Sequence, residues 1–284
     1  MCLFSACSEN SVPEQTLRQN YADAGFSEAQ QQLLDWYQKT DSPDSMASLF
    51  AKDRFAIQAM IGSLTRNAIF LRSDAQEARA AEQLGLAKKL AVDYAEHLCD
   101  DFFLRGVRFA DSLSGQALTK SLSAHYFYQQ GRWHSYEGRK DTAQTLFEQS
   151  LALSREIGDT AQQLDNLVQL QYLHYHCDQN SEALRLGEKI LAEASKTGYI
   201  RRMISAYYNG MANITIADYH GSLENLQKGL ALAEQTDDEH LKMLILGKMA
   251  NAYHKLGRLP EAADAFEKAL FLAQKRGDVD EELL

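Results

Sequence analysis

One pattern returns four times along the second half of this chain at a nearly constant spacing. Each copy has five marked positions, separated by three, four, five and four residues. The first position is small in most copies, and each later position holds residues of comparable size and character from copy to copy. The copies begin at Gly131, Gln171, Gly210 and Ala250, so corresponding positions are 40, 39 and 40 residues apart. This period is typical of stacked solenoids, in which each unit buries its apolar face only against its neighbours. The pattern therefore predicts an architecture and argues against a catalytic centre.

The composition favours helices throughout. The chain has three prolines, is rich in Leu, Ala, Gln, Glu and Lys, and has almost no strand-like alternation. Gly138 and Gly257 are expected to end first helices, because a left-handed backbone strains any other residue. The expected fold class is all-α, with helix pairs at 118–137 and 141–156, 160–177 and 181–196, 200–218 and 221–235, and 239–256 and 260–275.

Side-chain size at the repeat positions predicts how the helices of a pair pack. Small residues allow close approach of two antiparallel helices, and large ones fill the remaining space. The expected small positions are Gly131, Ala143, Ala183, Ala250 and Ala262, and the expected large ones are Phe147, Tyr253 and Phe266.

The residues before the repeats are expected to be helical but irregular. Ser73-Asp74 is expected to cap a helix from about Ala75 to Leu98, and Asp100-Asp101 a shorter one. Ser112 to Gly115 should interrupt the helical structure. The predicted organisation is an N-terminal tether (1–26), an irregular helical region (27–117), four repeats (118–276) and the start of a further repeat helix (277–284).

The fourth copy, from Leu246 through Ala269, resembles the tetratricopeptide repeat family, with the pattern Leu-Gly-x2-Ala-x2-Tyr-x3-Gly-x4-Ala-x3-Phe-x2-Ala. The resemblance extends over roughly residues 124–276. The two middle copies depart from the family pattern at Gln171, Asp178, Gly187, Asn213 and Ser222. The long period is similar to the extended variant of the repeat, which is common in bacterial regulatory and signalling proteins. The resemblance implies a right-handed α-solenoid of helix-turn-helix repeats whose first helices line a concave, ligand-binding groove.

The resemblance places a protein or peptide site on the concave face of the first helices. Residues three, four or seven apart share one helix face, and aromatic and arginine side chains on such a face suit protein contacts. For several of the tyrosines the alternative is packing between adjacent repeats. Trp133, one position off this face, is assigned to the core. The expected groove residues are Tyr128, Arg132, Tyr136, Tyr172, Tyr175, His176, Tyr207, Met211, Asn251, His254 and Lys255.

Several function classes are disfavoured by the sequence. A net charge of −10 argues against a nucleic-acid partner, because phosphate binding relies on Lys and Arg. No apolar run approaches the roughly 18 residues needed to span a bilayer. His174 and His176 point about 200° apart on a helix, so they cannot hold one metal ion. Phosphate-loop, GxSxG and HExxH patterns are lacking. We therefore expect no catalytic residue, metal or cofactor.

The segment Leu3 to Ser8 resembles a bacterial lipobox, the motif in which a cysteine, here Cys7, becomes lipidated. Phe4 stands where Leu is usual, and six residues before Cys7 are too few for an apolar leader. Two interpretations follow: a lipid-anchored protein of the cell envelope, touching the membrane through this anchor alone, or a cytoplasmic protein with an apolar N-terminus.

Residues 277–284 correspond, one period on, to Asp237–Leu244, which are expected to open a first helix. We expect either a fragment of a longer protein or a stub that a partner or oligomer caps. The leading hypothesis is a non-catalytic scaffold that binds a protein or peptide in its groove. One alternative is the sensor region of a larger signalling enzyme: a caspase-like peptidase, a diguanylate cyclase or a kinase. The other is a cytoplasmic regulator that binds a small peptide signal.

Overall fold

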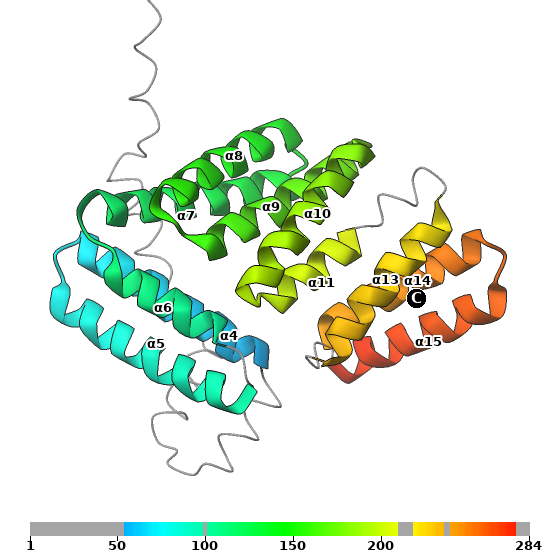
Figure 1. Ribbon diagram of the computed structural model, residues 1–284, viewed down its shortest axis with the longest axis horizontal. Helices are drawn as coiled ribbons and strands as arrows, with labels where there is room; N and C mark the ends of the chain where they lie inside the picture. Colours follow the sequence, from blue (N-terminus) through cyan, green and yellow to red (C-terminus); the bar gives the residue numbers. More distant parts are fainter. Residues whose placement is uncertain (1–53, 99–100, 210–217, 236–238, 277–284) are drawn as a thin grey trace, which may run out of the picture. The chain divides into compact units, whose positions relative to one another are not determined.

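The computed structural model describes residues 54–98, 101–209, 218–235 and 239–276, which form eleven α-helices and no strand (Figure 1). These helices divide into two compact units. The first unit comprises the described residues up to Gln130 together with 149–162, and the second comprises 131–148 and the described residues from 163 onward.

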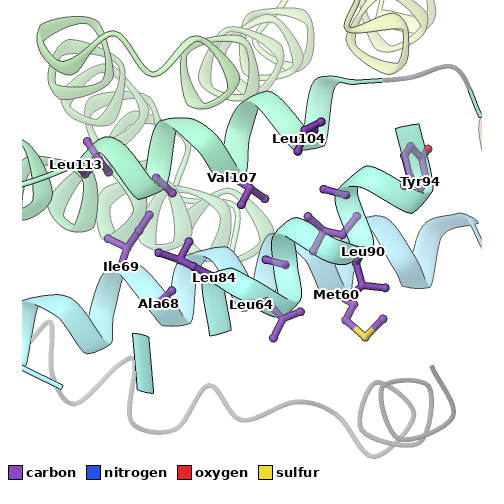
Figure 2. Packing of buried hydrophobic residues seen from close by; sticks show 14 of the residues in the cluster. Met60, Leu64, Ala68, Ile69, Leu84, Leu90, Tyr94, Leu104, Val107 and Leu113 are labelled. Carbon is purple, nitrogen blue, oxygen red and sulfur yellow. The ribbon is translucent and has the colours of Figure 1, made fainter. Parts of the chain in front are cut away.

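The first unit is built on α4 (Arg54–Ser73), α5 (Glu77–Leu98) and α6 (Phe102–Ser112). The first part of α7 (Gly115–Tyr136) and the last part of α8 (Lys140–Ile157) complete it. Apolar residues at helical spacing from the three leading helices interlock in one core, shown in Figure 2. Tyr94 is fully buried there, and its hydroxyl accepts a hydrogen bond from Gln58 Nε2 at 2.6 Å. That bond offsets the cost of burying a polar group.

The predicted cap of α5 is wrong. Ser73 is the last residue of α4, and its hydroxyl donates to the Phe70 carbonyl at 2.6 Å. The Asp74 carboxylate accepts from Gln76 Nε2 at 2.6 Å, two residues along the connecting turn. The backbone turns through Ala75, whose φ is +56°, so α5 begins only at Glu77. Asp101 does stand directly before α6, but it makes an ion pair with Arg105 at 3.0 Å and no side-chain cap hydrogen bond.

The second unit contains the rest of α7 and α8, followed by the repeat helices apart from residues 160–162. The latter are α9 (Thr160–His176), α10 (Asn180–Thr197), α11 (Ile200–Asn209), α13 (Tyr219–Gln235), α14 (Glu239–Lys255) and α15 (Leu259–Arg276). Where both ends of a helix are described, they lie within three residues of the predicted bounds. The helix predicted at 200–218 is the first helix of the third pair. Its predicted end lies outside the described residues, and so do Gly210 and Met211.

The turns between paired helices explain this agreement. Gly138 and Gly257 have φ of +75° and +73°, as predicted for residues that end first helices. Asp178 occupies the equivalent turn and has φ of +58°, a conformation that Asp tolerates better than most side chains. Because this turn chemistry is local, the sequence was sufficient to predict it.

In each of the first two repeats, a large side chain on one helix packs against a glycine on the other, and the two repeats place the glycine on opposite helices. A Cβ atom added to Gly131 would lie 2.8 Å from Phe147 Cε1, and Phe147 is fully buried. In the next repeat the large and small residues are reversed: Gln171 takes the place of the glycine and Gly187 the place of the phenylalanine. The Gln171 side chain is 1% exposed and lies so close to Gly187 that an added Cβ would be 2.5 Å from Nε2. Its Nε2 donates to the Ala206 carbonyl at 3.3 Å.

Two predicted core residues are exposed. Phe266 occupies the repeat position of Phe147, yet 47% of it is exposed, because no described helix covers that face of α15. Trp133 is 50% exposed, and the Arg139 guanidinium lies 4.3 Å above its ring. The ring therefore packs under the turn that follows α7 instead of between helices. Tyr253 is half-buried against the α13–α14 core, with Arg258 stacked 4.7 Å from its ring.

Candidate functional site

The predicted groove residues differ widely in exposure. Tyr128, in the first unit, is buried beside His125, so the packing alternative holds for it. In the second unit Tyr136 is 90% exposed and Tyr172 42% exposed. Tyr175 is half-buried and packs against the apolar core of α11, α13 and α14. Met211 lies outside the described residues.

Within the second unit an aromatic–cation patch comprises predicted groove residues of α7 and α9 together with Lys140, which joins the start of α8 to the end of α9. We define it by Arg132, Tyr136, Lys140, Tyr172 and His176. Arg132 and Tyr172 occupy equivalent positions one repeat apart, and so do Tyr136 and His176. The Tyr172 and His176 ring centroids are 4.2 Å apart, because residues four apart share one helix face. From the start of α8, Lys140 Nζ donates to the His176 carbonyl at 2.5 Å and ties the two repeats together.

Burial and two lysines act on the His176 ring of this patch. Partial burial lowers the pKa of His176, and the charges of Lys140 and Lys248 lower it further, so the imidazole is neutral at pH 7. Burial also lowers the pKa of Lys248, a residue of α14 whose charge acts on His176. The pKa of Tyr175 is raised by burial first, then by Asp178 and Tyr172. The patch thus combines two cationic side chains, Arg132 and Lys140, with the rings of Tyr136, Tyr172 and His176.

The sequence did not single out Lys140 or Lys248. Lys248 is spaced three and seven positions from the predicted Asn251 and Lys255, so the same helix-face rule could have included it. Lys140 gave no such signal, because it belongs to a second helix and reaches the patch only through the fold. Asn251, His254 and Lys255 are exposed on α14. Tyr207 is half-buried, with its Cβ 2.9 Å from where a Cβ on Gly229 would lie.

The histidines of α9 have separate surroundings. His174 Nδ1 is hydrogen-bonded with the side-chain amide of Gln179, whereas the His176 ring lies between Tyr172 and Tyr175. In the described part of the chain, no group of three or more His, Cys, Asp or Glu residues is arranged to hold a metal ion. Likewise, among the described helices none combines the length and the apolar character that crossing a bilayer requires.

Comparison with known proteins supports the repeat assignment. Residues 245–280 match the family model of the tetratricopeptide repeat. No curated protein matches the chain in sequence. The structure of aspartyl phosphate phosphatase F from Bacillus subtilis is similar, with a TM-score of 0.54 and 12% identity over 94% of this chain and 70% of that one.

Two further solved structures are similar at lower TM-scores. One is a putative Podosopora anserina kinesin light chain with nearly identical TPR-like repeats (TM-score 0.43, 19% identity, 75% of this chain and 98% of that one). The other is a STAND signal transduction ATPase with a tetratricopeptide repeat sensor from Pyrococcus horikoshii (TM-score 0.49, 13% identity, 90% of this chain and 42% of that one). The predicted resemblance to the tetratricopeptide repeat family and the predicted all-α solenoid fold are confirmed.

Proposed function

We propose that this chain is a non-catalytic scaffold that binds a protein or peptide segment on the aromatic–cation patch. The observation that carries the proposal is the exposure of Tyr136 and Tyr172 among Arg132, Lys140 and His176 at equivalent positions of adjacent repeats. Tyrosine and arginine dominate binding energy at protein interfaces, because they combine large contact area with a polar group. A segment that spans both repeats would contact all five side chains.

The titratable groups support a binding role. Apart from Tyr175, His176 and Lys248, the described groups with shifted pKa belong to exposed ion pairs between residues three or four apart. The side-chain hydrogen bond from Arg185 lowers the pKa of Glu182, and the one that Lys268 donates to the Asp264 carboxylate raises the pKa of Lys268. Catalytic groups are usually shifted by burial together with a charged partner in a cleft. Exposed helix-surface pairs of this kind are typical of structural positions.

The patch can be tested by removing its two central side chains. Selection from a random peptide library on the intact protein should yield binders, and the Arg132→Ala, Tyr172→Ala double variant should bind the selected peptides at least about 30-fold more weakly by fluorescence anisotropy. Both residues are exposed, so the far-ultraviolet circular dichroism should not change.

Arg185→Ala is the matched control, because Arg185 is an exposed arginine on α10, outside the patch. This variant should keep full affinity. Selected peptides that bind the double variant as tightly as the unchanged protein would place the binding surface elsewhere. A selection that yields no specific binder would also count against the proposal.

A lipid anchor at Cys7 is a second proposal, and it rests on the lipobox resemblance alone, because Cys7 lies outside the described residues. The anchor would hold the repeats at a membrane surface without altering the patch. Incorporation of a labelled fatty acid that persists in a Cys7→Ser variant would refute it. The alternative of a sensor region within a signalling enzyme is tested by the coding sequence that follows codon 284.

A further inference from the structure

Three helices of the second unit meet at His176, the last residue of α9. From the start of α8, Lys140 Nζ donates to the His176 carbonyl at 2.5 Å. On the other side, Tyr175 packs against the core cluster of α11, α13 and α14, which contains Met249. Lys248 precedes Met249 on α14, and its charge acts on the His176 ring. Helix α14 belongs to a repeat two further along the chain, so the fold adds a cation to the patch from a distant part of the sequence.

This gathering of like charges disfavours the folded state. Lys248 is half-buried, and burial lowers the pKa of its amine. The charges of Lys140 and Lys248 both disfavour the protonated form of His176. Basic groups that are drawn together and partly removed from water cluster at functional sites, where a ligand of opposite charge offsets the repulsion.

Neighbouring carboxylates of the chain act on other groups. Glu137 pairs with Arg139 at 3.9 Å, and Asp178 acts on Tyr175. Elsewhere in the second unit, the exposed ion pairs join a cation to a carboxylate three or four residues away. Lys140 differs from these cations, because its acceptor is a neutral backbone carbonyl that does not cancel its charge.

We propose that the aromatic–cation patch, extended by Lys248, takes an acidic segment of a partner protein, with a Glu or Asp carboxylate seated beside Lys140, Lys248 and His176. This inference rests on the function proposed above and specifies its ligand. Carboxylates accept charge-assisted hydrogen bonds from lysine amines, and the exposed Tyr172 ring offers contact area next to them. The chain carries a net charge of −10, so cations must gather locally to attract such a segment.

The placement of the cations favours side-chain carboxylates over the carboxylate of a chain terminus. Arg132 lies on α7, Lys140 on α8 and Lys248 on α14. A terminus brings one carboxylate to one point, whereas a segment with several acidic side chains matches cations that are contributed by separate helices. We therefore expect a free C-terminus to be dispensable for binding.

The test compares acidic peptides with their amide counterparts. Peptides selected on the intact protein from a random library are synthesised with amidated C-termini, each beside a version in which Gln and Asn replace Glu and Asp. By fluorescence anisotropy the acidic version should bind at least about 10-fold more tightly, the usual effect of a hydrogen bond between charged groups. Lys248→Met should weaken the acidic version by a similar factor and the amide version by less than about twofold.

Lys242→Met is the matched control. Lys242 is another half-buried lysine of α14, and it lies six positions from Lys248, about 120° away around the helix. Its replacement should leave the affinity for the acidic peptide unchanged. Methionine fills the space of either lysine without a charge, so the helical circular dichroism of both variants should match that of the unchanged protein.

The protonation of His176 gives an independent readout. Lys140 and Lys248 act on this ring from α8 and α14, and Tyr172 and Tyr175 contact it from its own helix, with Asp178 acting on Tyr175. A carboxylate seated there favours the imidazolium, so the acidic peptide should raise the pKa of His176 in an NMR titration, and the amide version should not. Affinity for the acidic peptide should rise as the pH falls from about 7.5 to about 5.5, since Glu and Asp stay ionised in this range.

The outcomes separate this inference from the function on which it rests. Selected peptides that bind equally well without their carboxylates, that require a free C-terminus, or that are insensitive to Lys248→Met overturn the inference and leave the binding role intact. Equal losses for Lys242→Met and Lys248→Met would reveal a general charge effect and would also overturn it. A selection that yields no specific binder contradicts the proposed function, and this inference with it.

Discussion

Phe147→Ala is expected to lower the free energy of unfolding by about 3–5 kcal/mol, the usual cost of truncating a fully buried phenylalanine. The ring is fully buried and lies against Gly131, where no Cβ could be added without a clash. Alanine would leave a cavity at the junction of α7 and α8. Gly131 has no side chain that could move into this cavity. Chemical denaturation followed by circular dichroism measures the loss.

Phe266→Ala provides the matched control for this prediction. Phe266 is the same residue type at the same repeat position, yet 47% of it is exposed. Its truncation should cost less than about 1 kcal/mol. Equal losses for the two variants would contradict the assigned burial. Such a result would mean that both rings are covered in solution.

Exchange of Gln171 and Gly187 is the second prediction with a large expected effect. Gly187→Phe alone should lower the free energy of unfolding by about 3 kcal/mol or more, because even a Cβ at this position would lie 2.5 Å from Gln171 Nε2. The Gln171→Gly, Gly187→Phe double variant recreates the arrangement of Gly131 and Phe147. It should recover more than half of the loss.

The double variant will not recover all of it, since the hydrogen bond from Gln171 Nε2 to the Ala206 carbonyl is lost, at a cost of about 1 kcal/mol. A double-mutant cycle, measured by chemical denaturation, should give a favourable coupling of about 1–3 kcal/mol between the two sites. Comparison of Gln171→Gly with Gln144→Gly separates the loss of packing from the cost of placing glycine in a helix. Gln144 also lies in a helix, but it makes no close contact like that of Gln171 with Gly187. If the two substitutions in the exchange are additive, the two positions are not in contact.

The proposed patch could be predicted only in part from the sequence. The helix-face rule brought together Arg132, Tyr136, Tyr172 and His176, which occupy equivalent positions of adjacent repeats and are exposed in the structure. The same rule also included Tyr128 and Tyr175, which pack inward. A helical face does not specify which of its residues a neighbouring helix covers. Lys140 joins the patch from a different helix, so no pattern within α9 could reveal it.

The sequence by itself determined the repeat and the bounds of those repeat helices whose two ends are described, because these depend on turn residues and on the spacing of small and large side chains along a single segment. Left-handed Gly138 and Gly257 end helices wherever they stand. Burial was decided only by the tertiary structure. Phe147 and Phe266 share one position in the motif, and Trp133 was also assigned to the core, yet only Phe147 is buried. The physical reason is that hydrophobic burial depends on the surface a neighbouring helix supplies, which is a property of the fold and not of the residue.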